Sequence, residues 1–362
     1  MTPKFHKLKI AEIRHEAGEC IAIGFAVPES LRDAYRYTQG QYLTIKQAVE
    51  QGELRRSYSI CAAVSDYSIN DQVWVAIKKV HGGRFSSHAH RHFSVGDDIE
   101  VMTPEGRFFS PLAAENDKHY VAFAAGSGIT PILSIMKTTL EVEAKSRFTL
   151  VYGNRKAQNI LFLEELEALK NLYLNRVRLI HILSAQPQEA DLFNGRINGD
   201  KTKALLSSLI PAETIDQAFI CGPSNMIDEV EAALLEAGVS KDQVHAERFG
   251  VAMTNSIAKP IVSSESIGKV AKLVVQLDGK TQEMAFPYEG ISLLDVALNN
   301  GLDLPFACKG GVCCTCRAKV LEGEVTMEKN YTLEKWEIDK GFVLTCQCHP
   351  ITDSVLISFD ER

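Results

Sequence analysis

The chain has 362 residues, of which 45% are hydrophobic, and a formal net charge of −7 at pH 7. This length and apolar content suffice for two or three domains with cores of their own. The net negative charge argues against a general nucleic-acid-binding protein. The N-terminal stretch MTPKFHKLKI lacks the apolar core of a secretory signal, and no run reaches the roughly 18 apolar residues of a membrane helix. We therefore expect a cytoplasmic protein that binds neither nucleic acid nor membranes.

The first part of the chain, residues 1–112, is a series of short segments rich in β-branched and aromatic residues. Glycine, aspartate, proline or serine separates them. The segments are CIAIGFAV, QYLTIKQ, RRSYSICAAV, QVWVAIKKV and DDIEVMTP. Their composition favours strands. Many short strands within about a hundred residues predict an antiparallel β-barrel.

A different pattern follows in residues 113–250. The segment HYVAFAAGSGIT is typical of a buried strand that leads into a glycine turn. Further strands are predicted at RFTLVYGNR, VRLIHILS and QAFICG, and helices at PILSIMKTTLEVEA, ILFLEELEALKNLY and SNMIDEVEAALLEAG. Strands that alternate with helices form βαβ units, so we expect an α/β domain with a parallel sheet.

The composition changes again near the C-terminal part of the chain. Residues 251–268 are small, polar and aperiodic, and we interpret them as a linker. Residues 269–362 begin with two alternating strands around the Asp-Gly pair 278–279, a favourable hairpin turn. The segment GISLLDVALNNG predicts a short helix with Ser292 and Asp295 as a capping pair. A cysteine-rich stretch, LPFACKGGVCCTCR, follows directly.

Four of the nine cysteines are spaced C-x4-C-x2-C with a fourth further along the chain. They are Cys308, Cys313, Cys316 and Cys346. Plant-type ferredoxins use this spacing to hold a 2Fe-2S cluster. Zinc sites favour paired C-x2-C elements or added histidines, whereas the gap of four and the single distant partner favour iron and sulfide. We therefore predict a 2Fe-2S cluster, in which Gly310 and Gly311 let backbone amides approach the sulfur atoms.

The remaining cysteines lie outside this spacing. Cys314 breaks it and Cys348 overshoots it, and we interpret both as non-ligand residues close to the cluster. Cys20, Cys61 and Cys221 lie in strand-like segments, where a free cysteine is commonly a small buried hydrophobe.

Two stretches of the first part are suited to a flavin. In RRSYSI, Arg56, Tyr58 and Ser59 alternate along a predicted strand, so that Arg56 and Tyr58 share one face and Ser59 takes the other. An aromatic ring beside a cation suits a planar cofactor that carries phosphate.

The second stretch, HGGRFSSHA, is a glycine turn before a helix start whose amides can hold a pyrophosphate. Its candidate residues are Gly82, Gly83 and Ser86. The histidines of HAHRH are spaced by two, and residues so spaced do not share a helix face. We therefore expect exposed histidines there rather than a metal site.

Two stretches of the second part are suited to a dinucleotide. The stretch AAGSGITPIL contributes Gly126, Gly128, Thr130 and Pro131. The glycines follow a buried strand, the threonine is placed to cap a helix, and the proline falls in its first turn. Glycines before a helix N-terminus form a dinucleotide phosphate site, although GxGxxP departs from GxGxxG. In FICGPSNM, a later strand ends at Cys221, Gly222 and Pro223, where ligands bind in open parallel sheets.

These motifs, in this order, resemble the ferredoxin-NADP reductase superfamily with a plant-type ferredoxin fused at its C-terminus. Residues 5–249 resemble the reductase part and 269–362 the ferredoxin part. The resemblance implies an FAD-binding β-barrel at 1–112, an NAD(P)-binding α/β domain at 113–250 and, after the linker, a 2Fe-2S ferredoxin domain of the β-grasp α+β class.

The resemblance also implies roles for residues. The R-x-Y-S motif and the glycine-serine loop would bind FAD, and the glycine turn and the C-G-P tripeptide would bind the nicotinamide dinucleotide. The segment HAERF resembles the end of the reductase part, with Glu247 and Phe249 near the flavin. Hydride would pass from NAD(P)H to the flavin beside Ser59, Cys221 and Glu247. Single electrons would then pass from the flavin to the cluster and to an oxygenase.

A narrower resemblance rests on ELRRSYSIC, GGRFS, AAGSGITP, YGNR, FICGP, ERF, ACKGGVC and EKNYTLE. These stretches resemble the reductase subunits of bacterial phenylacetyl-CoA epoxidase complexes. That family implies electron delivery to a di-iron oxygenase in phenylacetate degradation.

The choice of nucleotide depends on two strand ends. YGNRK places Arg155 and Lys156 where the adenosine ribose is expected, and the stretch has no acidic residue to hold a free 2′-hydroxyl. Because an arginine suits a 2′-phosphate, NADPH is favoured. The next strand ends in LSAQ, which keeps Ser184 but has Ala185 where plant-type reductases often carry arginine, so NADH stays open.

Two alternatives remain open. In the first, the chain is an NADH-dependent reductase of a ring-hydroxylating oxygenase or of a hybrid-cluster protein. In the second, it is an electron-carrier module that does not itself oxidise NAD(P)H. The nucleotide preference and turnover with an artificial acceptor distinguish these alternatives.

Overall fold

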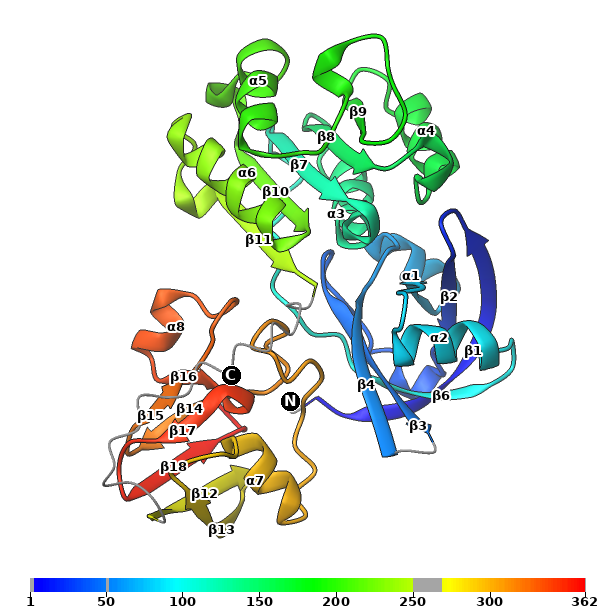
Figure 1. Cartoon of the computed structure of the whole chain (residues 1–362). Helices are drawn as coiled ribbons and strands as arrows, with labels where there is room; N and C mark the ends of the chain where they lie inside the picture. Colours follow the sequence, from blue (N-terminus) through cyan, green and yellow to red (C-terminus); the bar gives the residue numbers. More distant parts are fainter. Residues whose placement is uncertain (1–2, 50–51, 250–268, 362) are drawn as a thin grey trace. The chain divides into compact units, whose positions relative to one another are not determined.

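The computed structural model describes residues 3–49, 52–249 and 269–361, so the predicted linker lies outside the described residues. Contacts divide the chain into two compact units (Figure 1). One comprises residues 5–54 and 58–249, and the other contains the C-terminal region. In the described part of the chain, no helix combines the length and the apolar character needed to span a bilayer.

The N-terminal sheet has six strands in the order β4-β3-β6-β1-β2-β5. They are β1 (Phe5–Glu16), β2 (Cys20–Ala26), β3 (Tyr42–Val49), β4 (Gly52–Ser59), β5 (Gln72–Lys78) and β6 (Asp98–Met102). A bridge between Ile60 and Val75 joins the chain just beyond β4 to β5, so the sheet closes on itself. Alternating side chains such as Ile21, Ile23 and Phe25 fill the interior. The predicted antiparallel β-barrel is confirmed.

Two helices belong to the barrel: α1 (Val64–Asn70) and α2 (Arg84–His92). The sequence predicts one strand through RRSYSICAAV, and this is wrong beyond Ser59. The carboxylate of Asp66 accepts a hydrogen bond from the backbone N–H of Ala63 at 3.0 Å. This contact stabilises the first turn of α1 and overrides the strand preference of the apolar run.

The second sheet is fully parallel, in the order β11-β10-β7-β8-β9. Its strands are β7 (His119–Ala125), β8 (Arg147–Asn154), β9 (Val177–Leu183), β10 (Gln217–Gly222) and β11 (Val244–Arg248). The chain adds β8 and β9 on one side of β7 and then β10 and β11 on the other. The order therefore reverses between β7 and β10, and the crevice at their carboxyl ends is where such sheets bind ligands.

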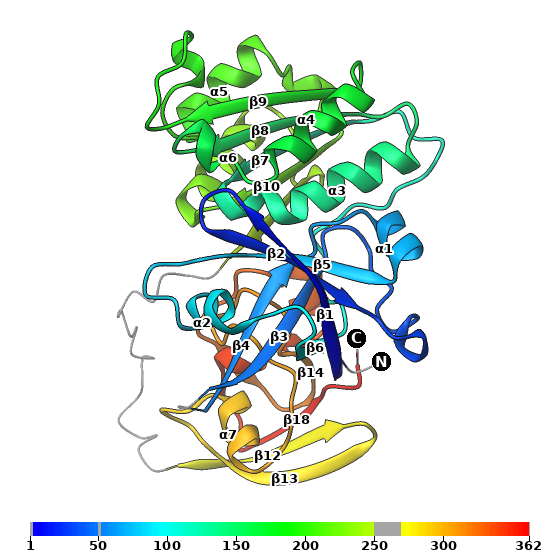
Figure 2. The same cartoon turned by 90° about the vertical axis from the view of Figure 1, so that its right-hand side faces the viewer.

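Helices cover both faces of this sheet (Figure 2). They are α3 (Ile129–Val142), α4 (Leu163–Leu172), α5 (Gly199–Ser208) and α6 (Ser224–Glu236). Tyr120 and Ala122 of β7 share a core with α3 and α4, whereas Val121 and Phe123 share one with α5 and α6. The first of these cores also includes Ala22 on the outer face of β2, so barrel and sheet share buried surface.

Helix α5 has no counterpart in the sequence prediction. It turns only a few apolar residues inward, such as Leu205 and Leu206, and is otherwise polar. Its start is fixed by Asn198, whose side chain accepts a hydrogen bond from Lys201 N at 2.8 Å. A short helix with so narrow an apolar face gives a weak periodic signal.

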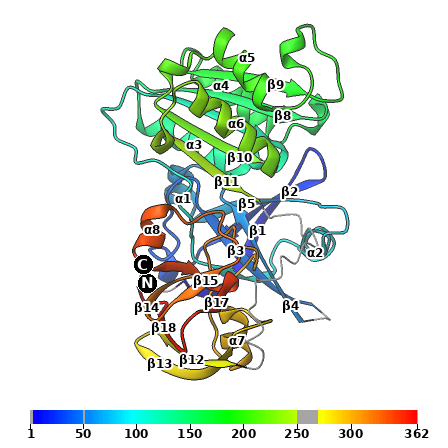
Figure 3. The same cartoon turned by 60° about the vertical axis from the view of Figure 1, so that its left-hand side comes forward.

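The C-terminal unit contains a five-stranded mixed sheet in the order β13-β12-β18-β14-β16 (Figure 3). Its strands are β12 (Val270–Leu277), β13 (Lys280–Pro287), β14 (Arg317–Glu322), β16 (Phe342–Leu344) and β18 (Ser354–Ser358), and β15 (Val325–Met327) pairs with β17 (Cys348–Pro350). The predicted hairpin turn is confirmed, because Asp278 and Gly279 both have positive φ.

Two helices complete this β-grasp α+β domain: α7 (Leu293–Asn299) and α8 (Lys335–Asp339). Ser292 caps α7 by accepting a hydrogen bond from Asp295 N at 3.2 Å, as the sequence predicts. Helix α8 has no counterpart in the sequence prediction. The cysteine-rich stretch lies between α7 and β14.

The fold generates a prediction at Gly128, which lies against the end of β10. A Cβ on Gly128 would lie 2.1 Å from the carbonyl oxygen of Cys221. Gly128→Ala therefore forces the first turn of α3 away from β10, and we expect a loss of about 1–3 kcal/mol in unfolding free energy. Thermal unfolding measures this loss. Gly199→Ala, whose nearest atom is 3.6 Å from the added Cβ, is the control; equal stability of the two variants would contradict the prediction.

Candidate functional site

Three residues predicted from the sequence meet where the barrel and the parallel sheet come together. Ser59 ends β4, is almost completely buried and donates a hydrogen bond to Oε2 of Glu247 at 3.0 Å. Glu247 lies on β11 in register with Cys221 of β10. Burial raises the pKa of Glu247 to about 8, although the bond from Ser59 opposes this rise. The carboxyl group is therefore mainly protonated at neutral pH.

The C-G-P tripeptide forms the end of β10 and the start of α6. Cys221 is fully buried, and burial raises the pKa of its thiol far above the ordinary value, with Glu247 adding to the rise. A protonated thiol is a compact, weakly donating group rather than a nucleophile. A Cβ on Gly222 would lie 2.6 Å from Cε of Met226, and Pro223 caps α6. The backbone therefore turns tightly at the crevice.

The glycine turn lies directly across this crevice, in the 3-10 helix η2 (Gly126–Gly128). Gly126 has a φ of +55°, and its carbonyl accepts a hydrogen bond from Tyr152 Oη at 2.8 Å. Lys78, at the end of β5, reaches this turn: its Nζ would lie 3.6 Å from a Cβ on Gly126. Sequence reasoning missed this cation, because no motif links it to a turn so distant along the chain.

The start of α3 differs from the prediction. Thr130 is predicted to cap the helix, and this is wrong, because α3 begins at Ile129 with Gly128 as its cap. Thr130 lies inside the first turn and donates its hydroxyl hydrogen to the carbonyl of Ser127 at 3.0 Å. The short η2 turn continues into α3 and moves the helix start toward the glycines. Pro131 lies in the same first turn, where a missing N–H breaks no intrahelical bond.

The two strand ends predicted for the adenosine ribose lie side by side. Arg155 and Lys156 follow β8, Ser184 follows β9, and all three are exposed. The backbone N–H of Ser184 donates to the carbonyl of Asn154 at 3.0 Å, and that of Ala185 to the carbonyl of Arg155 at 2.8 Å. The cations and the hydroxyl therefore share one edge of the sheet.

The glycine-serine loop forms a tight turn ahead of α2. Gly82 has a φ of +70°, and a Cβ on Gly83 would lie 2.6 Å from Oγ of Ser86. Ser86 Oγ accepts a hydrogen bond from Val80 N at 3.1 Å. Within the described barrel, no side chain caps the start of α2. Its first N–H groups are therefore available to an anion.

The R-x-Y-S residues lie on β4 as the alternation predicts. The ring of Tyr58 lies 5.7 Å from that of Phe85 on α2, so it faces the helix that carries the glycine-serine loop. Arg56 is exposed, and its Nη1 donates to the carbonyl of Arg55 at 2.7 Å. Phe249, just beyond β11, is 41% exposed.

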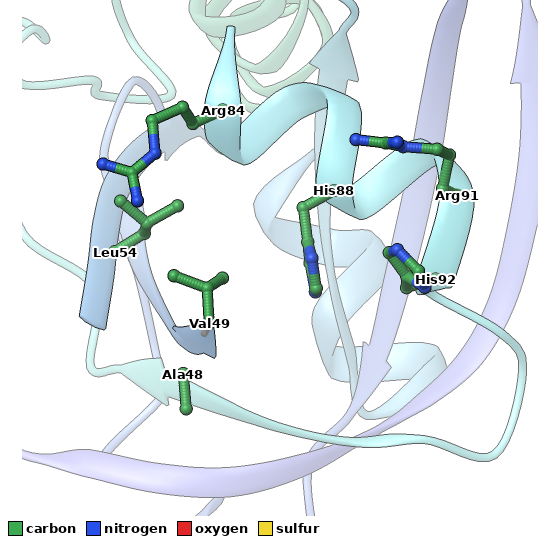
Figure 4. A pocket seen from close by; sticks show the side chains of 7 residues that line it. All are labelled: Ala48, Val49, Leu54, Arg84, His88, Arg91 and His92. Carbon is green, nitrogen blue, oxygen red and sulfur yellow. The ribbon is translucent and has the colours of Figure 1, made fainter. Parts of the chain in front are cut away.

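A pocket of about 700 Å³ lies between α2 and the ends of β3 and β4. Its lining residues are Ala48, Val49, Leu54, Arg84, His88, Arg91 and His92. His88 projects from α2 into the space beside Val49 (Figure 4). The pocket therefore adjoins the helix that follows the glycine-serine loop, and none of its lining residues takes part in the contact between Ser59 and Glu247.

Two of the three histidines of α2 share this pocket. The rings of His88 and His92 lie 4.6 Å apart, because a spacing of four places them on one face of the helix. Sequence reasoning considered only the spacing of two and missed this pair. Burial and then His92 lower the pKa of His88. Arg84 and Arg91 add two guanidinium groups to the same pocket.

The four predicted cluster ligands form two pairs. The thiol of Cys313 interacts with that of Cys308, and the thiol of Cys346 interacts with that of Cys316. The Cys313 thiol lowers the pKa of Cys308 to about 5, and the Cys316 thiol lowers the pKa of Cys346. Across the described residues, no three Cys, His, Asp or Glu side chains converge on one metal position. Two pairs suit two irons joined by sulfide better than one tetrahedral zinc ion.

The loop around these cysteines is suited to anionic sulfur. Gly310 N donates to Sγ of Cys308 at 3.3 Å, as the sequence predicts. Gly311 has a φ of +77°, and a Cβ there would lie 2.9 Å from the carbonyl oxygen of Lys329. The remaining cysteines of this domain make other contacts: Cys314 donates to Thr332 Oγ1 at 2.9 Å and Cys348 to the carbonyl of Leu344 at 3.2 Å. The chemistry of the four-cysteine set therefore fits a 2Fe-2S cluster.

The fold and these sites define a class of protein: a flavin- and nicotinamide-dependent oxidoreductase joined to an iron-sulfur electron carrier. Three family models match the chain: the oxidoreductase FAD-binding domain over residues 7–109, the oxidoreductase NAD-binding domain over 123–232, and the 2Fe-2S iron-sulfur cluster binding domain over 275–350. The chain belongs to the ferredoxin-NADP reductase superfamily with a C-terminal 2Fe-2S domain, and within it to the reductase components of oxygenase systems.

Its relatives match nearly the whole chain. One component of the 1,2-phenylacetyl-CoA epoxidase of Escherichia coli is 44% identical over 99% of this chain and 98% of its own. The ferredoxin reductase component of 3-ketosteroid-9-alpha-monooxygenase from Rhodococcus rhodochrous is 33% identical over 97% and 96%. The phthalate dioxygenase reductase structure matches 98% of both chains with a TM-score of 0.59 at 22% identity, which supports the fold. The protein is an oxidoreductase that passes electrons through FAD and 2Fe-2S to an oxygenase.

The raised pKa of Glu247 generates a prediction about stability. The unfolded carboxyl group loses its proton near its ordinary pKa of 4.5, whereas the folded one keeps it to about pH 8. In this window the native state binds more protons, so stability falls as pH rises. We expect Glu247→Gln to gain about 1–2 kcal/mol relative to the native chain between pH 5 and pH 8, allowing for partial exposure.

Thermal unfolding of the FAD-loaded protein across this pH range measures the difference. Glu213→Gln, at an exposed position, is the control and should show no such trend. A pH-independent difference between Glu247→Gln and the native chain would mean that the carboxyl group is ionised in the folded protein.

Proposed function

We propose that the protein takes electrons from NADPH at the crevice between β7 and β10. It would pass them through FAD to a 2Fe-2S cluster held by Cys308, Cys313, Cys316 and Cys346, and then to the di-iron oxygenase of a phenylacetyl-CoA epoxidase complex. The observation that carries this proposal is the return of Cys346 to the loop of the other three cysteines, where Thr345 and Gln347 are hydrogen-bonded to that loop. We place the reaction in the cytoplasm and in phenylacetate degradation, the latter supported by the name of the Escherichia coli relative.

The FAD site would extend along β4 and α2. Tyr58 would contact the flavin ring and Arg56 its phosphates, together with the N–H groups behind Gly82, Gly83 and Ser86. The pocket between α2 and the β3–β4 hairpin would take the adenosine half, because it combines two guanidinium groups with an apolar floor (Figure 4). Phe249 would lie beside the flavin.

The reaction site would lie around Ser59, Glu247 and Cys221. FAD, when bound, accepts a hydride and releases electrons singly, which connects a two-electron donor to a one-electron cluster. Glu247 would hold a proton on its carboxyl group, oriented by the hydroxyl of Ser59. The buried thiol of Cys221 would fill the bottom of the crevice and exclude water.

Recognition of the nucleotide would divide between two places. The N–H groups of the glycine turn would bind the pyrophosphate, beside Thr130 and Pro131 at the helix start. Gly222 and Pro223 would lie opposite and enclose the nicotinamide. Lys78 would add a positive charge beside this turn. Arg155, Lys156 and Ser184 would bind the 2′-phosphate that distinguishes NADPH from NADH, because they gather at one edge without an acidic residue in the β8 loop.

The first test is an anaerobic titration of the purified protein with NADPH and, separately, NADH. We expect flavin and iron-sulfur absorption bands, both of which bleach with NADPH at lower concentration than with NADH. Cys346→Ser should lose the iron-sulfur bands and keep the flavin reduction. Cys348→Ser should keep both, because the Cys348 thiol donates to the Leu344 carbonyl and belongs to neither thiol pair. Adding the oxygenase component with phenylacetyl-CoA tests the acceptor.

Two spectroscopic results would contradict the proposal, wholly or in part. If the native protein has no iron-sulfur bands, or if neither nucleotide bleaches them, the proposed electron transfer to the cluster is wrong. Equal bleaching by the two nucleotides would leave the chain intact and remove only the preference for NADPH.

Two substitutions separate the parts of the nucleotide site. Arg155→Ala should lower kcat/KM for NADPH by about ten- to a hundredfold and leave that for NADH nearly unchanged, because only NADPH carries the 2′-phosphate. Lys78→Met should weaken both nucleotides alike, because both carry the pyrophosphate. Steady-state kinetics with ferricyanide as acceptor measures both effects. An Arg155→Ala variant that loses both nucleotides equally would place this arginine outside the 2′-phosphate site.

A further inference from the structure

The side chains on both sides of Cys346 tie this distant cysteine to the rest of the cluster loop. Thr345 precedes it and donates from Oγ1 to the carbonyl oxygen of Cys316 at 2.9 Å. Gln347 follows it and donates from Nε2 to the carbonyl oxygen of Lys309 at 3.1 Å. Cys346 is therefore held at its place by one neighbour on each side, although it lies far from the other ligands in sequence.

The amide of Gln347 also faces the sulfur of Cys346. Its Nε2 lies 3.4 Å from Sγ and 2.9 Å from the carbonyl oxygen of Cys346. Two N–H donors therefore face three acceptors, counting the carbonyl of Lys309. The opposite orientation of the amide would turn Oε1 toward the same acceptors, so the hydrogen bonds fix which atom faces the sulfur.

Gln347 has little freedom to leave this position. Its side chain is 6% exposed, so solvent scarcely competes for the amide. It packs beneath the cluster loop, where a Cβ on Gly311 would lie 3.3 Å from Cγ of Gln347. Its backbone carbonyl accepts a hydrogen bond from Glu328 N at 2.9 Å. Both the main chain and the side chain are therefore fixed in the domain.

We propose that Gln347 is a positioning residue for Cys346 and that its amide raises the reduction potential of the cluster. This inference rests on the proposed four-cysteine ligand set. Reduction adds one electron to the cluster, and the sulfur ligands share the added negative charge. An N–H donor stabilises that more negative state more than the oxidised one, so it makes the cluster easier to reduce.

Backbone N–H groups act on the sulfur atoms of both Cys308 and Cys346, and at Cys346 a side-chain amide is added. Sγ of Cys308 receives a hydrogen bond from the backbone N–H of Gly310 at 3.3 Å, which a side-chain substitution does not delete. Sγ of Cys346 receives one from a side chain. The potential is therefore adjustable by a single substitution at Gln347.

The test compares Gln347→Met with Thr345→Val in the full-length protein. Methionine keeps the length and volume of glutamine and removes both donors. At a fixed potential we expect about a tenfold lower ratio of reduced to oxidised cluster, which is a negative shift of about 59 mV for a one-electron couple. Thr345→Val removes a bond that positions Cys346 without touching its sulfur, and it should shift the ratio much less.

An anaerobic redox titration followed by EPR of the reduced cluster measures both variants, and the flavin bands of the same samples serve as an internal reference that should not move. A Gln347→Met protein whose cluster has the native potential overturns the inference. A native protein without any cluster overturns instead the proposed function on which it rests, so the two failures are distinct.

A second measurement uses the native chain and covers the case in which Gln347→Met does not retain its cluster. Glutamine labelled with 15N at the side-chain amide is incorporated, and pulsed EPR of the reduced cluster is recorded. The amide nitrogen of Gln347 is close enough to the ligand sulfur to show a hyperfine coupling to the cluster. Absence of any coupled 15N from the labelled amide would contradict the inference.

Discussion

The hydrogen bond from Ser59 to Glu247 connects the proposed flavin site with the proposed nucleotide site. It joins the last residue of a barrel strand to the edge strand of the parallel sheet, at 3.0 Å. It forms because the two sheets already share a core, in which Ala22 of β2 packs with Tyr120 and Ala122 of β7. Packing of the outer face of the barrel therefore determines where the hydroxyl and the carboxyl group meet. A partly buried carboxyl group with a raised pKa stays mainly protonated at this junction, so the contact requires no counter-charge.

The cysteine set obeys a different constraint, because three of its members are close together in the sequence and the fourth is far from them. Cys308, Cys313 and Cys316 share one curled loop, and the 3-10 helix η7 (Thr345–Gln347) carries Cys346 to it. The loop is tight enough that Gly311 has no room for a side chain. The resulting two pairs agree with a binuclear centre, in which each iron takes two protein thiolates. The strands β16 and β17 therefore flank the 3-10 helix that returns one cysteine to the other three.

Features that depend on local periodicity or fixed spacing could be predicted from the sequence. The barrel, the parallel sheet, the Asp278-Gly279 turn and the Ser292 cap follow from residue types a few positions apart. The predictions fail where one local contact overrides a pattern. Asp66 ends the apolar run early and starts α1, and the η2 turn places Thr130 inside α3 rather than at its cap. Helix α5 has too narrow an apolar face to give a clear period.

The candidate site residues also fall into two groups: those that motif spacing predicts and those that only the fold brings together. The roles proposed for the glycines and cysteines of the motifs depend on backbone shape and metal affinity. Such roles demand a residue type at a fixed spacing, which a sequence shows directly. Lys78 and Gln347 instead place a charge or an amide against a segment that is distant along the chain. No spacing rule predicts such a contact, because residues that the fold brings together can be any number of positions apart in the sequence. The residues proposed to hold the cofactors are therefore visible in the sequence, whereas those proposed to adjust affinity and potential become visible only in the structure.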